Sequence, residues 1–413
     1  MMKSSRLIAF EVLHRIFGDG GYSNLSLDSA LADVSEDKAF ITALVYGVVE
    51  RKITLDYYIN KYVASKPKPK IMTILRLGAY QLLYMDKVPS SAAINESVKL
   101  TKDIRQDYYA GLVNAVLHKI DEERDEVDDL SVNYSVPQNL INMWVKQYGE
   151  DTVKAFLPKT LEKPAVFAVP NTLYVDADEL EYELLDEGIE CEAVNGLVSV
   201  ESVGTLFETK AYKNGLFHIE DISSYNCACA LGAKAGETVI DMCSAPGGKA
   251  FTIAERMNNE GELNAFDLYE SRLRLVDDGA QRLGITIIKT DACDATEYNE
   301  NIPKADRILC DVPCSGFGII RRKPEIKYKE LDDIKELPKI QLAIASNAAR
   351  YLKDGGTMIY STCTLNKKEN ERVVEAFLKE HREFTLEEQK TVFTGDNGGD
   401  GFFYAKLVKL NEN

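Results

Sequence analysis

Two cysteines follow apolar runs of the kind that form buried β-strands. Cys314 comes after ADRILCD (305–311) in a Pro-Cys pair, and Cys363 comes after GGTMIYS (355–361) in a Thr-Cys pair. A single cysteine is most often a small buried apolar side chain. Two cysteines at the carboxyl ends of neighbouring parallel strands would lie close together, where one thiolate can act as a nucleophile. The spacing alone does not decide which of the two attacks.

One reaction that needs such a thiolate beside a methyl donor is the methylation of carbon 5 of cytosine. That carbon is a poor nucleophile because the ring is aromatic, and addition of a thiolate at carbon 6 makes it an enamine carbon. Asp311 can bond the ring nitrogen and the amino group, which calls for a raised pKa and a proton to donate. Lys249 or the substrate complex would lower the pKa of the attacking cysteine. The base must be unpaired or flipped out of its stack.

A glycine-rich turn follows another apolar run, ETVIDM (237–242), and is the expected cofactor site. Glycines at a strand-to-helix turn let a ligand approach the backbone and the first amides of the helix. The turn has neither the spacing of a phosphate-binding P-loop nor the G-x-G-x-x-G pattern of dinucleotide sites. Its residues are Cys243, Ser244, Ala245, Pro246, Gly247, Gly248 and Lys249.

Acidic residues end the next strand-like runs. Asp267 stands 26 residues after Asp241, where a carboxylate can accept bonds from a ribose diol, and Asp291 ends the third run, within reach of an adenine amino group. Acids in place of cations suit a nucleoside cofactor without phosphates, and a sulfonium charge favours an acidic pocket. The pattern therefore predicts S-adenosyl-L-methionine, bound by the turn, Asp267 and Asp291.

Strand-like and helix-like segments alternate from residue 222 onward. This alternation predicts a parallel sheet with helices on both faces, whose ligands bind beyond the carboxyl ends of the strands. The strand candidates are 237–242, 262–267, 285–291, 305–311 and 355–361, and 271–284 is one of the helical segments between them.

Helices are expected to dominate the first part of the chain. Apolar residues recur at helical spacing through residues 1–120, which predicts a bundle of five or six helices before a charged linker at 121–129. Two more helices are expected within 133–160, and a small α/β unit without a catalytic constellation within 164–220. We therefore predict three domains, at 1–130, 131–221 and 222–413.

The net charge of −17 argues against a protein that coats nucleic acid non-specifically. The acidic excess lies after residue 120, because residues 1–120 hold 16 Lys and Arg against 12 Asp and Glu. Residues 321–329 (RRKPEIKYK) form a local basic run with five cations and one acid. We expect this run to contact the phosphates of an RNA substrate.

Neither a metal site nor a membrane segment is expected. The eight cysteines include no C-x-x-C pair and do not cluster with histidines, and Cys227 and Cys229 are expected to be buried thiols. No apolar run reaches the roughly 18 residues that cross a bilayer. The N-terminal segment mixes charges into its apolar run, which is typical of an amphipathic helix and not of a signal peptide. A cytoplasmic location is therefore predicted.

Several motifs resemble those of a known enzyme family. DMCSAPGGK, DVPCSGFG, YSTCTLNKKENE and DGFFYAKL resemble the signatures of the NOL1/NOP2/Sun RNA 5-methylcytidine methyltransferases. The segments ALVYGVVERKITLDYYI, LRLGAYQLLYMDKVPSSAAINESVKLTK and GLVNAVLHKI are similar to the NusB-like domain of the bacterial RsmB (Sun) type. The resemblance implies a Rossmann-like methyltransferase domain, with a mostly parallel seven-stranded sheet, after an all-α NusB-like RNA-binding domain.

The resemblance also implies roles for individual residues. Cys363 would be the nucleophile, Cys314 would assist elimination and release, and Asp311 would complete the catalytic set. S-adenosyl-L-methionine would be bound by the residues from Cys243 to Lys249 and by Asp267, Asp291 and Asp311. The substrate would be an unpaired cytidine of the small-subunit (16S) ribosomal RNA. The alternatives are a non-catalytic NusB-like RNA-binding factor, a methyltransferase for another RNA, and a DNA cytosine methyltransferase in which the Pro-Cys cysteine attacks.

Overall fold

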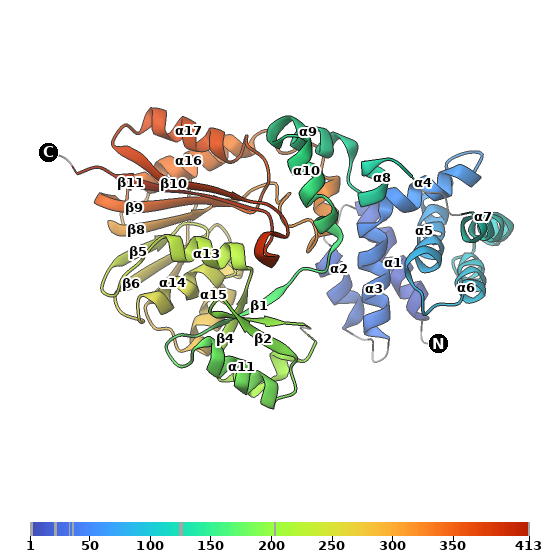
Figure 1. The fold of residues 1–413 in the computed structure, drawn as a ribbon, viewed down its shortest axis with the longest axis horizontal. Coiled ribbons are helices and arrows are strands. Elements are labelled where there is room, and N and C mark those ends of the chain that lie inside the picture. Colours follow the sequence, from blue (N-terminus) through green and yellow to red (C-terminus); the bar gives the residue numbers. More distant parts are fainter. Residues whose placement is uncertain are drawn as a thin grey trace. The chain divides into compact units, whose positions relative to one another are not determined.

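A computed structural model describes residues 3–19, 23–32, 34, 37–123, 127–201 and 204–411. They form two compact units (Figure 1). The first unit runs to Leu161 and also contains Ile320–Lys329, and the second contains the residues from Glu162 to Ile319 and from Glu330 onward. The chain therefore enters the first unit twice. The division into three domains at 130 and 221 stays a prediction.

The first unit is helical, as expected. The apolar side chains that recur at helical spacing, among them Ile41, Leu44, Val45 and Val48, are fully buried in a single core. Its α-helices are α1 (Ser5–Asp19), α2 (Ser23–Leu31), α3 (Lys38–Glu50), α4 (Lys52–Tyr62), α5 (Pro69–Tyr84), α6 (Ser90–Asp103), α7 (Ala110–Glu122), α8 (Leu130–Tyr134), α9 (Gln138–Tyr148) and α10 (Glu150–Phe156), with short 3₁₀ turns η1 (Asp107–Tyr109) and η2 (Pro158–Leu161).

The expected number of helices was wrong. Within residues 1–122 the described part of the chain forms seven α-helices, not five or six, and α8 precedes the two helices expected within 133–160. One break falls between α3 and α4, where neither glycine nor proline marks it. There Arg51 leaves the helical backbone (φ −96°, ψ 12°) and lays its guanidinium over the Tyr84 ring, 4.7 Å from the centroid. A tertiary contact thus accompanies a break that local sequence does not signal.

The basic run at 321–329 is exposed only in part: Lys323 is exposed, whereas Arg321 and Lys327 are buried. It contains the 3₁₀ turn η4 (Pro324–Tyr328), which packs on the helical core. Lys327 is 3% exposed and donates a hydrogen bond to the Glu50 carbonyl oxygen (2.7 Å), and the Tyr328 hydroxyl donates to the Val49 carbonyl oxygen (2.8 Å). Burial lowers the pKa of Lys327 to about 7. Arg321 is buried as well, so these two cations do not face solvent as a phosphate surface would.

The second unit contains two sheets. Its elements are β1 (Val166–Pro170), α11 (Ala177–Asp186), β2 (Cys191–Val194), β3 (Leu197–Val200), η3 (Leu206–Glu208), α12 (Lys210–Lys213), β4 (Phe217–Glu220), α13 (Ile222–Ala230), β5 (Thr238–Asp241), α14 (Gly248–Arg256), β6 (Glu262–Asp267), α15 (Glu270–Leu283), β7 (Ile288–Ala292), β8 (Ala305–Asp311), α16 (Leu337–Ala349), β9 (Leu352–Thr362), α17 (Glu371–Glu380), β10 (Phe384–Val392), η5 (Asp396–Gly398) and β11 (Phe402–Lys409).

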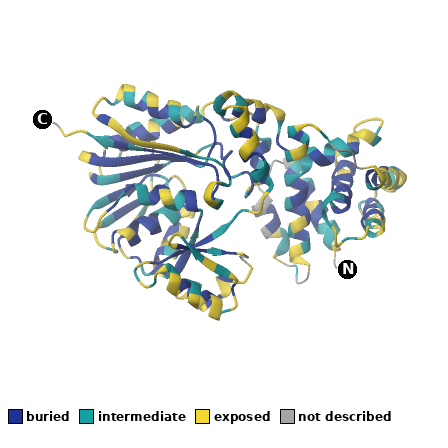
Figure 2. Cartoon of the chain, in the orientation of Figure 1, coloured by how far each residue is buried: buried dark blue, intermediate teal, exposed yellow. Residues whose placement is uncertain are grey.

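The larger sheet has seven strands in the order β10-β11-β9-β8-β5-β6-β7. The pairs β5–β6, β6–β7, β5–β8 and β8–β9 are parallel, and β11 runs antiparallel to both of its neighbours. Helices α16 and α17 cover one face, and α13, α14 and α15 cover the other (Figure 1). The central strands are therefore buried on both sides (Figure 2). The mostly parallel, doubly covered sheet confirms the predicted fold class.

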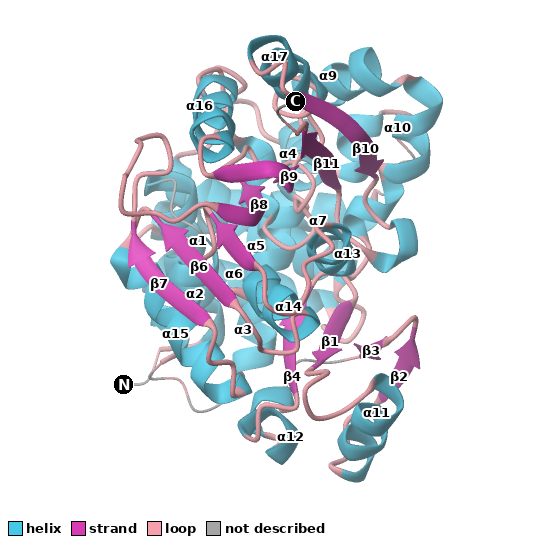
Figure 3. Cartoon of the chain, turned by 90° about the vertical axis from the view of Figure 1, so that its left-hand side faces the viewer, coloured by secondary structure: helices cyan, strands magenta, loops and turns pink. Residues whose placement is uncertain are grey.

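The smaller sheet is antiparallel, in the order β2-β3-β1-β4, with α11 packed beside it (Figure 3). Asn171, fully buried, links it to the larger sheet. Its side-chain amide donates to the carbonyl oxygens of Gly215 (2.9 Å) and of Leu283 at the end of α15 (2.8 Å). Among the described residues no helix combines the length and apolar character that a membrane span requires.

Candidate active site

The carboxyl ends of five parallel strands carry the residues predicted from the sequence. Along this edge the order is Asp291 of β7, Asp267 of β6, Asp241 of β5, Asp311 of β8 and then Cys363, which directly follows β9. The chain builds β5, β6 and β7 outward in one direction and places β8 and β9 on the opposite side of β5. The connection order therefore reverses between the neighbouring strands β5 and β8. Ligands of such sheets bind at this switch point, beyond the carboxyl ends of the strands.

The two cysteines converge, as the sequence predicted. Cys314 Sγ and Cys363 Sγ lie 3.2 Å apart, and both residues are half-buried. The contact with Cys363 and then burial raise the pKa of Cys314 well above the usual range of a thiol. Either sulfur can donate in this contact, and the raised pKa of Cys314 favours its thiol form.

A buried carboxylate ties the two cysteine loops together. Glu369, which is fully buried, accepts hydrogen bonds from the backbone N–H (2.8 Å) and the hydroxyl (2.6 Å) of Ser315, the residue after Cys314. The side-chain amides of Gln341 (3.1 Å) and Asn366 (2.8 Å) donate to the same carboxylate. Sequence reasoning quoted Glu369 within a motif and assigned it no role, because a buried glutamate and a solvated one look alike in a sequence.

A close approach of two glycines holds the same loops. The Gly318 N–H donates to the Cys363 carbonyl oxygen (3.1 Å), and the Gly401 N–H donates to the Gly318 carbonyl oxygen (2.9 Å). A Cβ atom on Gly318 would overlap the Gly401 carbonyl oxygen. Gly318, the second glycine of DVPCSGFG, and Gly401 of DGFFYAKL are therefore required by this backbone contact.

Lys249 contacts Asp311 and not a cysteine. Its Nζ donates to Asp311 Oδ2 (2.7 Å) and to the Ser224 hydroxyl (2.8 Å), and the Ser361 hydroxyl donates to Asp311 Oδ1 (2.8 Å). Although burial opposes its charge, Asp311 raises the pKa of Lys249. Lys249 was expected to lower the pKa of a catalytic cysteine. In the structure its ammonium group forms an ion pair with Asp311. The expected action of Asp311 as a proton donor stays a prediction.

The glycine-rich turn lines a cavity of about 170 Å³ between β5 and β8. Gly247 has a positive φ of 113° at the start of α14, where a side chain would collide with the Phe251 ring. The lining residues are Ile219, Glu220, Ser224, Asp241, Cys243, Ser244, Ala245, Pro246, Gly248, Lys249 and Asp311.

Two buried polar atoms in this wall, Asp241 Oδ2 and Ser244 Oγ, have no hydrogen-bond partner among the described residues. Burial and then the charge of Asp311 raise the pKa of Asp241 to about 7. Buried polar atoms without partners are rare in native proteins, and those beside a cavity point to a bound polar molecule. A carboxyl group and a hydroxyl with unused hydrogen-bonding capacity fit a cationic nucleoside such as S-adenosyl-L-methionine.

The other two predicted acids lie at the ends of the next strands. Asp267 is 3% exposed, forms an ion pair with Arg272 (Oδ2 to Nη1, 2.9 Å) and accepts from the Tyr269 N–H (3.1 Å). Arg272 also donates to the Ala245 carbonyl oxygen (2.7 Å), so it connects the glycine-rich turn to Asp267. Asp291 is exposed on β7. Neither aspartate lines the cavity of the turn.

Sequence reasoning missed the contribution of the smaller sheet. No catalytic constellation was expected in the segment 164–220, and Glu220 at the end of β4 lines the cavity of the glycine-rich turn. The available signal was the pattern His218-x-Glu220 on a short strand, because alternate residues of a strand share a face. Cys227 is buried as expected, whereas Cys229 is half-buried.

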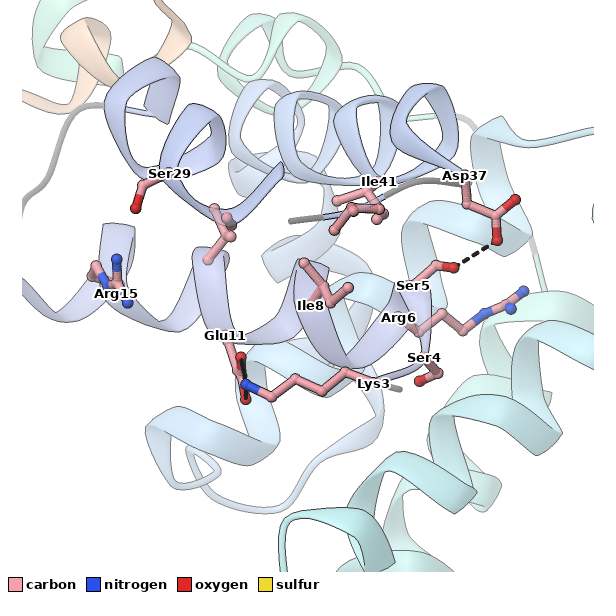
Figure 4. Close-up of a pocket in the computed structure, with 13 residues that line it drawn as sticks. Lys3, Ser4, Ser5, Arg6, Ile8, Glu11, Arg15, Ser29, Asp37 and Ile41 are labelled. Carbon is pink, nitrogen blue, oxygen red and sulfur yellow. Dashed lines mark hydrogen bonds and ion pairs between the residues drawn. The ribbon is translucent and has the colours of Figure 1, made fainter. Parts of the chain in front are cut away.

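A larger cavity of about 730 Å³ lies in the helical unit, lined by α1, α2 and α3 (Figure 4). Some of its charged groups have partners within its own wall, since Lys3 contacts Glu11 (2.7 Å) and the Ser5 hydroxyl donates to Asp37 (2.7 Å). None of the site residues predicted from the sequence lines it. In the described part of the chain no three His, Cys, Asp or Glu side chains are grouped to hold a metal ion.

Comparison with known proteins identifies the relatives of the chain. Residues 228–408 match the family described as 16S rRNA methyltransferase RsmB/F, and residues 3–122 match the NusB family. A Bacillus subtilis protein named probable ribosomal RNA small subunit methyltransferase B is 37% identical and covers 99% of this chain and 100% of its own length. The ribosomal RNA small subunit methyltransferase B of Escherichia coli O1:K1 is 31% identical over 98% of this chain and 99% of its own.

A solved structure, that of PH0851, has a TM-score of 0.82 with 26% identity and covers 99% of this chain and 100% of its own. These likenesses extend over both units, and they confirm the resemblance drawn from the cysteine and glycine motifs. The chain belongs to the RsmB-type family of 16S rRNA methyltransferases, with a NusB-like helical domain before a Rossmann-like methyltransferase domain.

Proposed function

We propose that this protein transfers a methyl group from S-adenosyl-L-methionine to carbon 5 of a cytidine in 16S ribosomal RNA, through a covalent bond between Cys363 and carbon 6. Membership of the family and the names of the relatives support the ribosomal RNA substrate. The observation that carries the proposal is the 3.2 Å contact between Cys363 and Cys314 at the switch point, beside an acidic, glycine-rich turn.

The cofactor would be held by the turn from Cys243 to Lys249, with Asp267, Asp291 and Asp311. When bound, it supplies an electrophilic methyl group on a sulfonium sulfur. The buried acceptors of Asp241 and Ser244 have hydrogen-bonding capacity to spare for its polar groups. Electrostatic attraction between the Asp241 carboxylate and a positively charged ligand is strengthened by burial.

Cys363 would act as the nucleophile, as the resemblance to the family implies, with Cys314 beside it as a thiol. With Cys314 protonated, its S–H can donate a hydrogen bond to the Cys363 sulfur. The thiolate forms a bond to carbon 6, and the electron pair of the ring double bond moves toward carbon 5 and the ring nitrogen. Asp311, which accepts hydrogen bonds from Lys249 and Ser361, would also accept one from the cytosine amino group and fix the base.

Release would reverse the addition after methylation. A base removes the proton of carbon 5, the ring double bond forms again, and the bond from carbon 6 to the Cys363 sulfur breaks with its electron pair on sulfur. The S–H of Cys314 stabilises this leaving thiolate. A cysteine that keeps its proton is suited to that task.

The deciding experiment maps 5-methylcytidine in 16S rRNA from cells with and without this gene. We expect one cytidine to lose its 5-methyl group without the gene and to regain it when the purified protein and the cofactor are added to unmodified RNA. An unchanged 16S methylation map would refute the proposed substrate. Transfer to another RNA, or to DNA with Cys314 as the attacking residue, would then be the outcome to test.

A further inference from the structure

A buried ionic cluster lies directly behind the cofactor turn. It joins His218 and Glu220 of β4 to Thr252 and Glu255 of α14, and all four side chains are at most 8% exposed. The imidazole lies between the two carboxylates, with Nε2 3.7 Å from Glu220 and Nδ1 3.4 Å from Glu255. The Thr252 hydroxyl donates to Glu220 Oε2 (2.9 Å).

Within this cluster Glu220 alone also lines the cofactor cavity. Its carboxyl group faces the start of α14, where a Cβ atom added to Gly248 would lie 3.3 Å from Glu220 Oε1. One oxygen is therefore fixed by Thr252, and the other lies beside the turn. A long, flexible glutamate side chain held in this way loses little further freedom when it binds a ligand.

The charges of the cavity leave a place for a cation. Lys249 is already engaged by Asp311 and Ser224, and it is the only basic side chain among the described residues of the cavity wall. Although burial opposes protonation, the contacts with Glu220 and Glu255 raise the pKa of His218 to about 9. A single imidazolium faces two carboxylates, so a further positive charge near Glu220 would be stabilised.

We propose that Glu220 is a cofactor-binding residue that accepts hydrogen bonds from the α-ammonium group of the methionine part of S-adenosyl-L-methionine, with Thr252 and His218 as positioning residues. This inference rests on the proposed function, because it assigns one part of the proposed cofactor to one side chain. The adenosine part is assigned to the other side of the turn, where Asp267 and Asp291 end their strands. The cofactor would thus span the turn from the larger sheet to the smaller one.

Two ligands separate this role from a structural one. S-Adenosylhomocysteine carries the amino acid group, and 5′-methylthioadenosine is the corresponding thioether without it. Calorimetric titration of the full-length protein with each ligand gives two dissociation constants. We expect Glu220→Gln to weaken binding of S-adenosylhomocysteine by about 10- to 100-fold, the range for loss of a hydrogen bond to a charged group, and to leave 5′-methylthioadenosine within about twofold.

The controls use other members of the cluster. Glu255→Gln removes a carboxylate that does not line the cavity, and we expect a smaller change that is equal for the two ligands. Thr252→Val leaves the Glu220 carboxylate in place and removes the group that orients it, so binding of S-adenosylhomocysteine alone should weaken, by about 5-fold. If Glu220→Gln loses both ligands through misfolding, Thr252→Val decides the matter.

Equal weakening of both ligands by Glu220→Gln and by Thr252→Val would overturn the inference, as would no change for either ligand in both variants. Failure of the unmodified protein to bind either ligand would instead refute the proposed cofactor. The failure of the inference and the failure of the proposed function are therefore distinguishable.

Discussion

Glu369 offers the sharpest test of how the two cysteines are held together. The substitution Glu369→Gln keeps the shape of the side chain and converts one carboxylate oxygen into an amide group that can only donate. Each oxygen now accepts from two donors, one set being the Ser315 hydroxyl with Asn366 and the other the Ser315 N–H with Gln341. Whichever oxygen is replaced, two donors then face an amide NH₂.

The size of the effect follows from these contacts. Two hydrogen bonds to a charged acceptor contribute about 1.5–3 kcal/mol each. Removal of a fully buried charge offsets part of their loss. We therefore expect the free energy of unfolding of the second unit to fall by about 2–3 kcal/mol, which for a unit of this size lowers the Tm by about 5–10 °C.

Two assays measure the consequence. Thermal unfolding gives the Tm, and Glu375→Gln on the exposed side of α17 is the matched control, expected to leave it unchanged. Diamide takes two electrons and two protons from Cys314 and Cys363 to form a disulfide, and peptide mapping follows its rate. We expect Glu369→Gln to slow this reaction by about tenfold, because the loops no longer hold the sulfurs together. A variant with the Tm and the oxidation rate of the unmodified protein would refute the reasoning.

The remaining predictions concern the chemistry and its frame. Cys363→Ala should abolish methylation while S-adenosylhomocysteine binding by calorimetry stays within about twofold, and methylation near the original rate would end its assignment as nucleophile. Cys314→Ala should let the protein–RNA adduct accumulate on denaturing gels, and normal turnover without adduct would remove its role in release. Gly318→Ala should lower the Tm by about 5–10 °C, since the new methyl group overlaps a backbone carbonyl; an unchanged Tm contradicts this. Because contacts with two glutamates raise the pKa of His218 to about 9, its contribution to stability is complete below about pH 6.5 and is lost as the pH rises through 9. The unfolding free energy should fall by about 3 kcal/mol across that window, and His218→Gln should remove most of this dependence.

The edge that bears the site could be predicted because its signals are local. Asp311 and the residues after Thr362 follow apolar runs, and the rule that parallel strands end at one edge brings them together. The convergence of Cys314 and Cys363 needed only the further inference that their strands are neighbours, which the pairing of β8 with β9 confirms.

The features that sequence reasoning missed depend on partners far along the chain. Lys327 lies in a run of cations that looks solvated, yet it is buried against a carbonyl group 277 residues away. Glu220 comes to the cofactor cavity from a different sheet, and Glu369 is recognisable as a buried acceptor only when its four donors are in place. Packing between distant segments decides burial, and one sequence contains no direct signal of it.

The second entry of the chain into the helical unit has a consequence for how this protein can be divided. Residues 320–329 leave the methyltransferase domain soon after Cys314 and complete the core of the other unit, where Tyr328 is packed. A fragment that ends at Leu161 would lack residues 320–329, so the part of its core that packs against Tyr328 would be exposed. A fragment that starts at Glu162 would contain these residues without the core on which they pack. The two units therefore cannot be separated by a single cut. A truncation or a domain swap designed in that way would remove packing contacts from both of them.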